Sequence, residues 1–441
     1  MSTDIEIPIT SEDLGLSEID KSTRADIVTG IIHNINGVRD VVSTLLQGEE
    51  KFIDDIEGLR RAFFGMVMQA VGTNGNLKLV CQDIPKKSLI STEDGPIVLE
   101  RQRLQIVHAI RDLFVPPPGN PQETVAYIRA MVERAGLLDG DPRRRTFVWG
   151  GHRIPPKEYD YAKSIGYYDA LSNKTEFITG CGPGAMKAPF KGAIVADSQR
   201  NVPVENKSYI GFSEPKIIGT EPPHGLVNNL VMFRNIAERI IAFIGASQRG
   251  RAHEGGAGTL HEILTFLSVI THENNRDCDY PLDLLDRSKD GLYMKRLQTY
   301  LKNIFDDSLD QNLKFHFGTD PKEFAEYVLK TNKPEKPLWN DDLYFPKSVL
   351  SSPGFSFEDI EKIDLSANQP PSNLLYQLEI LFNAIIELSF KNPSIVKSWG
   401  KERPLLNGDP KIVELTEEFI DSLYAEDRIV MINNQKIFRT K

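Results

Sequence analysis

The chain has 441 residues, of which 40% are hydrophobic and 26% charged, and its formal net charge is −10 at pH 7. These values are typical of a soluble globular protein of two or three domains and exclude a disordered or fibrous chain. The negative charge disfavours binding to nucleic acid or to an anionic membrane, because the field of the whole protein opposes it.

Residues 1–140 are predicted to form a mostly helical N-terminal domain, which is a candidate regulatory domain. Its first residues are acidic where a signal peptide would be basic and then apolar. No run in the chain reaches the ~18–20 apolar residues of a membrane span, so we expect a cytoplasmic protein. A short β-type run at 77–81 interrupts the helices. Four segments carry apolar residues at helical spacing: 26–46, 52–71, 101–115 and 122–135.

From residue 141 to 332 short β-type runs alternate with helices, and glycines follow the first two runs. This pattern predicts an α/β core with a Rossmann-like, doubly wound parallel sheet. Ligands of such sheets bind beyond the carboxyl ends of the strands. The predicted strands are 146–149, 175–179 and 208–212. The predicted helices are 158–170, 185–198 and 227–243.

The polar, proline-containing segment 330–337 is the predicted linker to a third unit, residues 333–441. We expect this C-terminal domain to be of the α+β type. Its predicted elements are helices at 372–390 and 411–425 and a final β-type run at 428–438.

The most informative stretch is Glu254 to Glu262, in which three of four consecutive positions, 255, 256 and 258, are glycine and an apolar helix is expected from 263 to 270. Glycines let backbone N–H groups approach a ligand closely, and a helix N-terminus adds partial positive charge. We therefore expect a phosphate site. Glu262 would repel a bare phosphate, so its expected target is a sugar hydroxyl or a reacting carbon attached to that phosphate.

Two further glycine loops, at 150–152 and 180–186, follow predicted strands. Each alone could be a tight strand-to-helix turn, but three such loops in one sheet favour a composite site for a nucleotide phosphate. None has the Gly-Lys-Ser/Thr ending of a P-loop, so hydrolysis of nucleoside triphosphates is not expected. Cys181 lies in one loop without a His–Asn constellation and is predicted to be a packing residue. The three cysteines are widely spaced and predict reduced thiols, with no metal and no cofactor.

Taken alone, Arg239 and Glu262 could be ordinary helix residues. Together with the loops they form a family pattern. The order Gly-Gly-His, Thr-Gly-Cys-Gly-Pro-Gly-Ala-Met, Arg239 and Gly-Gly-Ala-Gly-Thr-x-x-Glu resembles the lonely-guy phosphoribohydrolases, long mislabelled lysine decarboxylases. The similarity is strongest over 147–245 and extends to the longer bacterial members, which carry extra domains on both sides of the Rossmann-like core.

The resemblance implies hydrolysis of the N-glycosidic bond of a nucleoside 5′-monophosphate, which gives a free base and ribose 5-phosphate. It makes Glu262 the catalytic carboxylate, which stabilises oxocarbenium character at the anomeric carbon, and Arg239 the catalytic arginine. The residues expected to bind the phosphate or line the site are Gly255, Gly256, Gly258, Thr259, Gly150, Gly151, Gly182, Gly184 and Met186. A guanosine tetra- or pentaphosphate effector and a homo-oligomer, a dimer or a tetramer, are also implied.

Three features depart from the family pattern. Glu254 replaces a proline beside the phosphate site, and Lys187 stands where the long members usually have glutamate. The polar segment 247–253 occupies the place of an apolar central strand, so we expect this strand to pair poorly or to be rebuilt from neighbouring residues. The polar segment and Glu254 keep open a non-catalytic regulator that binds a nucleotide or alarmone, and a scaffold for partners is a further alternative. Amino-acid decarboxylation is rejected, because no lysine has the context of a pyridoxal phosphate site.

Overall fold

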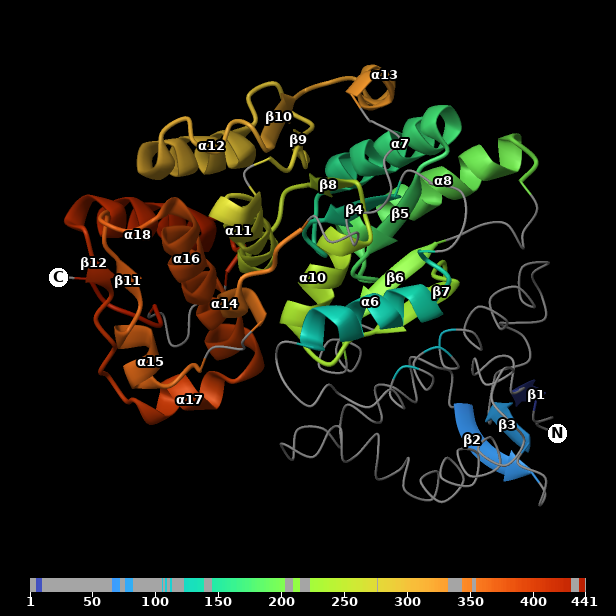
Figure 1. Cartoon of the computed structure of the whole chain (residues 1–441), viewed down its shortest axis with the longest axis horizontal. Coiled ribbons are helices and arrows are strands. Elements are labelled where there is room, and N and C mark those ends of the chain that lie inside the picture. The colour runs from blue at the N-terminus through green and yellow to red at the C-terminus, as the bar shows by residue number, and fades with distance from the viewer. Residues whose placement is uncertain are drawn as a thin grey trace.

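A seven-stranded parallel sheet forms the centre of the computed structural model (Figure 1). The structure describes strands at 5–9, 66–71 and 76–81, positions 105, 108 and 112, and residues 123–138, 145–202, 209–214, 223–275, 277–331, 343–350, 354–429 and 436–440. The order of the parallel strands is β10-β9-β8-β4-β5-β6-β7. Their bounds are β4 (Arg145–Trp149), β5 (Glu176–Thr179), β6 (Ile210–Ser213), β7 (Asn229–Met232), β8 (Arg249–Ala252), β9 (Leu282–Asp286) and β10 (Leu313–Phe317). The predicted doubly wound α/β fold is confirmed.

The order of the strands creates a switch point between β4 and β8. From β4 the chain builds outward through β5, β6 and β7, and it then returns to the other side of β4 to add β8, β9 and β10. The loops that leave the carboxyl ends of β4 and β8 therefore diverge to opposite faces of the sheet. This is where ligands bind in open α/β sheets.

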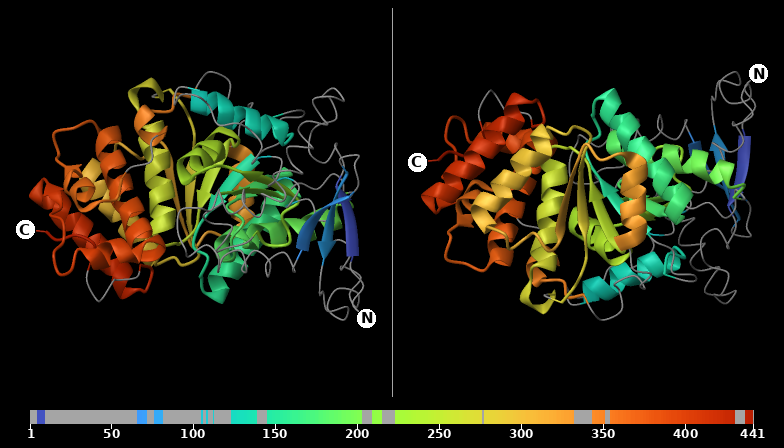
Figure 2. Two further views of the ribbon diagram at one scale, coloured as in Figure 1. Left: turned by 90° about the horizontal axis from the view of Figure 1, so that it is seen from below. Right: turned by 90° about the horizontal axis from the view of Figure 1, so that it is seen from above.

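Helices cover both faces of the sheet, as Figure 2 shows from two sides. One layer contains α7 (Pro156–Asn173), α8 (Ala188–Gln199) and α13 (Pro321–Thr331), which pack on one another. The other contains α6 (Thr124–Arg134), α10 (Ile236–Gly245), α11 (Ala257–Ile270) and α12 (Leu292–Phe305). Every residue of α11 except Gly258 is buried.

The C-terminal part is a helical group that packs on α11 through its long helix α16 (Pro371–Ile386). A π-helical turn at 387–391 extends α16, and two-residue strands β11 (Asp364–Leu365) and β12 (Asn407–Gly408) pair in parallel. The other helices are α14 (Lys347–Leu350), α15 (Phe357–Glu361), α17 (Pro393–Ser398) and α18 (Pro410–Ala425). At the opposite end of the molecule, β1 (Ile5–Ile9), β3 (Asn76–Cys81) and β2 (Met66–Val71) form an antiparallel sheet (Figure 1).

Several predicted boundaries are wrong. The helix predicted over 52–71 ends in strand β2, and the helix predicted over 227–243 is strand β7 followed by α10. Short apolar runs do not distinguish a buried strand from a buried helix, which explains both errors. The predicted helix at 26–46 lies outside the described residues. The β-type run predicted over 428–438 forms no strand in its described residues. A single bridge joins Leu405 to Arg439, the residue after this run.

The expectation that the polar segment 247–253 disturbs the sheet is wrong. Strand β8 consists of four residues of this segment, pairs in parallel with β4 and β9, and is buried throughout. Gly250 and Ala252 face the apolar layer, where a Cβ on Gly250 would lie 2.2 Å from the ring of Phe147. Arg249 and Arg251 point to the opposite face, where they contact α13 and α7.

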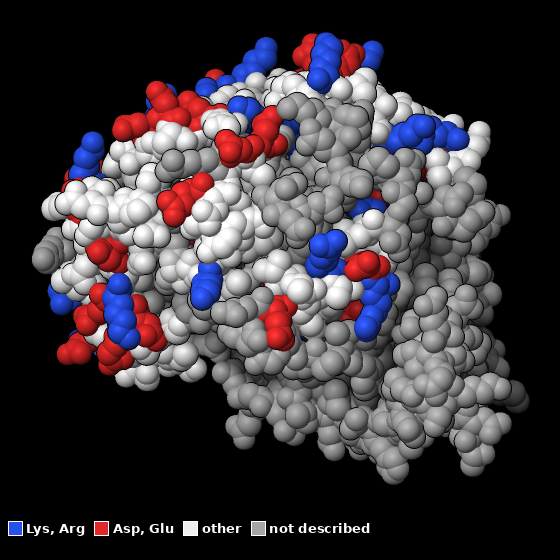
Figure 3. All heavy atoms as spheres, in the orientation of Figure 1, with Lys and Arg blue, Asp and Glu red and all other residues white. Residues whose placement is uncertain are grey.

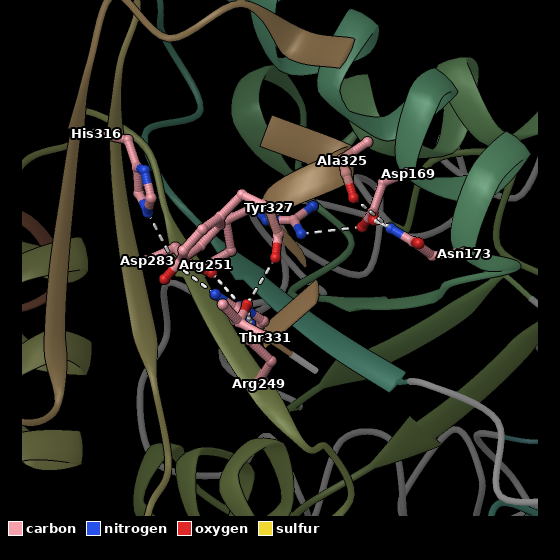
Figure 4. Close-up of polar contacts among 9 residues, drawn as sticks. All are labelled: Asp169, Asn173, Arg249, Arg251, Asp283, His316, Ala325, Tyr327 and Thr331. Atoms are coloured by element: carbon pink, nitrogen blue, oxygen red, sulfur yellow. Dashed lines mark hydrogen bonds and ion pairs between the residues drawn. The ribbon is translucent and has the colours of Figure 1, made fainter. Parts of the chain in front are cut away.

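Each buried arginine of β8 has a buried carboxylate partner (Figure 4). Arg249 forms a two-pronged ion pair with Asp283 of β9, and its Nη1 donates to Thr331 Oγ1 at 3.0 Å. The Arg249 guanidinium and the His316 ring hold the pKa of Asp283 down at about 2, against the opposing effect of burial. Arg251 Nη2 donates to Asp169 of α7 at 2.9 Å. These pairs explain how a charged sequence forms a central strand.

On the surface, acidic and basic side chains are interspersed over the described part of the face in Figure 3. No described helix has both the length and the hydropathy of a membrane span.

We predict that Asp283→Asn lowers the free energy of unfolding by ~3–5 kcal/mol, because it leaves the Arg249 charge buried without its counter-charge. Urea denaturation measures the change. The control is Asp307→Asn, which breaks the exposed pair of Asp307 with Lys302 and should leave the unfolding midpoint unchanged. Equal effects of the two variants would contradict the structural role of the buried pair.

Candidate functional site

Three glycine loops meet at the switch point and are joined by backbone hydrogen bonds. Gly151 N–H, after β4, donates to the carbonyl of Glu254, after β8, at 2.8 Å. Ala185 N–H, in the loop after β5, donates to the carbonyl of Gly151 at 3.0 Å. The predicted loops at 150–152, 180–186 and 254–258 therefore form one continuous surface.

Glycine is required where these loops cross. Gly184 has a φ of +65°, and a Cβ there would lie 2.4 Å from the carbonyl oxygen of Gly151. A Cβ on Gly150 would lie 2.6 Å from the Cβ of Ala185. Gly182 is buried in the same turn as Gly184. Side chains at Gly150 and Gly184 would separate the loops.

The predicted phosphate cradle lies at the start of α11. The helix begins at Ala257, earlier than predicted, so Gly258 and Thr259 lie in its first turn and Gly256 is the N-cap residue. Gly256 has no side chain that could cap this helix end, and Gly258 is exposed. Uncapped N–H groups in the first turn of a helix are the usual partners of an anion at a helix N-terminus. Gly255 lies so close to Thr259 that a Cβ would be 2.1 Å from the hydroxyl.

The two predicted catalytic side chains are buried beside each other. Arg239 projects from α10 and Glu262 from α11, and Nη2 of the arginine lies 3.4 Å from Oε1 of the glutamate. Arg239 Nε has no hydrogen-bond partner among the described residues. Gly180 lies between this arginine and Met186, since its Cβ would be 4.0 Å from Arg239 Nη1 and 2.9 Å from Met186 Sδ. The structure thus brings the residues chosen from the sequence together.

Burial raises the pKa of Glu262 to about 7. Arg239 and His261 act in the opposite direction, while the negative charge of Glu214 adds to the increase. Glu262 can therefore exist as a carboxylate or as a carboxylic acid near neutral pH. A carboxyl group with such a perturbed pKa at the end of a sheet is typical of functional sites.

Glu214 was not among the predicted site residues. It follows β6 directly, is 2% exposed, and its Oε1 has no hydrogen-bond partner in the described part of the chain. The hydroxyl of the adjacent Ser213 is also buried without a hydrogen-bond partner among the described residues. A signal existed in the sequence, because Glu214 follows the β-type run 208–212 as the glycines follow the other runs.

Cys181 and Lys187 flank the middle loop. Burial raises the pKa of Cys181 to about 12, although Arg239 lowers it, so the thiol stays protonated and packs in the apolar core as predicted. Lys187 is half-buried next to the start of α8, and burial together with Lys191 lowers its pKa.

Two residues from the C-terminal part also reach the site. Glu379 of α16 lies 2.5 Å from Nε2 of His261, the neighbour of Glu262. Arg428, just after α18, forms an ion pair with Glu254. No local sequence pattern marks Glu379 or Arg428 as a residue of the site. Among the described residues, no group of three or more His, Cys, Asp or Glu side chains is arranged to hold a metal ion.

Glycine loops around a buried Arg–Glu pair at the switch point of a parallel sheet define a Rossmann-like protein with a candidate anion-binding site. Residues 186–327 match the family described as "Possible lysine decarboxylase", and residues 326–437 match "Pyrimidine/purine nucleotide monophosphate nucleosidase, C-terminal". The family resemblance found in the sequence is therefore confirmed over residues 186–437, where one family model matches each part of the range.

The pyrimidine/purine nucleotide 5′-monophosphate nucleosidase of Escherichia coli K12 is 30% identical over 305 residues, as are its counterparts in strains O6:H1 and O157:H7. The match covers 66% of this chain and 65% of the relatives, so the chain spans slightly under two thirds of their length. Among solved structures, the molybdenum cofactor carrier protein of Chlamydomonas reinhardtii matches 43% of this chain and 97% of its own, at 15% identity and a TM-score of 0.29.

We predict that Gly184→Ala destabilises the protein by at least ~1–2 kcal/mol, because the backbone conformation disfavours a Cβ and the carbonyl of Gly151 blocks it. The matched control is Gly258→Ala, where a Cβ meets nothing within 4 Å and stability should be unchanged or slightly higher. Urea unfolding of both variants checks this. Similar losses in the two variants would rule out the proposed crossing of the loops.

Proposed function

We propose that the protein hydrolyses the N-glycosidic bond of nucleoside 5′-monophosphates to a free base and ribose 5-phosphate. The observation that carries this proposal is the buried Glu262, which lies beside Arg239 in the second turn of the helix that forms the phosphate cradle. The name of the Escherichia coli relatives supports the same reaction.

In this mechanism the 5′-phosphate binds to the N–H groups of Gly255, Gly256, Gly258 and Thr259. The ribose then extends along α11 toward Glu262. As the bond between C1′ and the base nitrogen breaks, its electrons leave with the base, and positive charge develops at C1′ next to the carboxylate. Water adds its hydroxyl to C1′, and its proton completes the base. Arg239 orients Glu262 through their contact at 3.4 Å.

The remaining predicted residues shape the other side of this site. We assign Gly150 and Gly151 to the wall next to the phosphate, and Gly182, Gly184 and Met186 to the wall opposite α11. Their supporting observation is the hydrogen-bonded contact of the loops at the switch point.

Two sequence features favoured a non-catalytic regulator, and ion pairs account for both. The polar segment 247–253 contains a regular central strand whose arginines are paired. Glu254 is paired with Arg428. No specific observation therefore favours a binding-only function over catalysis. A homo-oligomer and a guanosine tetra- or pentaphosphate effector remain predictions from the family resemblance, and a cytoplasmic location remains a prediction from the sequence.

Replacing the catalytic carboxylate tests the reaction. We expect Glu262→Gln to lower kcat for release of ribose 5-phosphate by ~10²–10³-fold, because the uncharged amide does not stabilise positive charge at C1′. The control Glu326→Gln changes an exposed glutamate of α13 and should leave kcat unchanged. The proposal fails if the wild-type protein releases base from no member of a nucleoside monophosphate panel, or if Glu262→Gln is fully active.

A second prediction concerns pH. Ionised Glu262 is the required form, so kcat/KM should rise as pH increases through about 7. Glu214 raises this pKa, and Glu214→Gln should therefore move the rising limb to lower pH. The substrate titrates identically with both enzymes, so the difference between their profiles reports on the protein. If the rising limb of Glu214→Gln stays in place or moves to higher pH, Glu262 is not the group whose ionisation the profile reports.

A further inference from the structure

The C-terminal part of the chain contacts the phosphate cradle through one arginine. Arg428 Nη2 lies 2.5 Å from Glu254 Oε2, and Nη1 donates to the carbonyl of Gly255 at 3.3 Å. The backbone follows the same surface, since a Cβ on Gly256 would lie 2.5 Å from the Arg428 carbonyl oxygen. The end of the C-terminal domain therefore packs directly on the loop that begins α11.

Arg428 is itself held in place on its other sides. Its Nε donates to Glu426 at 2.7 Å, and its guanidinium lies 4.5 Å from the ring centre of Tyr293. Glu426 is in turn paired with Arg296 of α12. This alternating set of charges fixes the direction from which the guanidinium reaches the loop.

Glu254 places a negative charge beside the cradle, and Arg428 compensates this charge. The carboxylate immediately precedes the glycines of the cradle. Burial raises its pKa, Arg428 lowers it, and the nearby carboxylates Glu158 and Asp286 add to the increase. An anion bound at the start of α11 would meet this negative charge at short range if no cation neutralised it.

Arg428 also lies at one end of a chain of contacts through all three loops. It bonds to the side chain of Glu254, whose carbonyl accepts from Gly151, whose carbonyl accepts from Ala185. A change in the position of Glu254 is therefore transmitted to both other loops.

We propose that Arg428 is a positioning residue for phosphate binding: by pairing with Glu254 it holds that carboxylate and neutralises its charge at the rim of the cradle, so that an anion can bind to the N–H groups beside it. The proposal rests on the proposed function in naming the anion as the 5′-phosphate of the substrate. Arg428 acts through Glu254 and does not itself touch the substrate. The competence of the catalytic core for its ligand thus depends on the C-terminal domain.

A double-mutant cycle on the full chain tests this proposal, with ribose 5-phosphate as the calorimetric probe. Arg428→Met leaves Glu254 unpaired and should weaken binding roughly tenfold or more, whereas Glu254→Gln removes the repulsion and should change binding less than about threefold. The double variant Glu254→Gln/Arg428→Met should recover binding to within about fivefold of wild type. Arg428→Lys, which keeps the charge, should lie between wild type and Arg428→Met.

The control is Lys436→Met, which breaks ion pairs with Glu417 and Asp421 within the C-terminal domain and should not change binding. Recovery of binding in the double variant distinguishes the proposed role from simple structural support. If Arg428 and Glu254 only supported the fold, the binding losses of the two single variants would add in the double variant. The proposal is overturned if wild type does not bind ribose 5-phosphate, if Arg428→Met binds it normally, or if the double variant binds as weakly as Arg428→Met. Binding and its recovery without turnover of any nucleoside monophosphate would support the proposal while refuting the proposed function.

Discussion

Ion pairs between the central strand β8 and its neighbours fix the position of the candidate site. Arg249 and Arg251 face α7 and α13, where buried carboxylates meet them, while Gly250 between them packs on Phe147. A shift of the strand by one residue would exchange its faces and bury both guanidinium groups away from their carboxylate partners. The register of β8 is therefore specified by ion pairs, where most central parallel strands rely on apolar packing alone. The loop Glu254 to Gly256 leaves this strand and inherits its position.

The architecture of the core could be predicted because its signals are local. Strands that end in glycine, separated by helices, indicate a parallel sheet with loops gathered at one edge, and the loops at Gly150, Gly184 and Gly255 do meet there. Arg239 and Glu262 could be paired in advance only through the family resemblance, since 23 residues separate them and neither position is unusual by itself. Their contact depends on the packing of α10 beside α11, which no periodicity reveals.

What could not be predicted depends on partners distant in sequence. Asp169 lies 82 residues from Arg251, and 174 residues separate Glu254 from Arg428. Without these partners, a charged central strand and a glutamate beside a phosphate site indicated a damaged pocket. The contacts of the C-terminal part could not be predicted for the same reason. It covers the otherwise exposed side of α11 and places Glu379 beside His261, the neighbour of Glu262, so two regions of the chain enclose the helix that carries Glu262.

The composition of β8 also bears on how the chain avoids misassembly. Central parallel strands are usually apolar and uncharged, and such segments aggregate readily when they are exposed before the sheet has closed. Arg-Gly-Arg-Ala has two positive charges and a glycine in four residues, so the unfolded segment repels copies of itself. The same two charges meet their carboxylate partners on α7 and β9 only in the folded sheet, so they oppose association of unfolded chains and are compensated once the strand is buried.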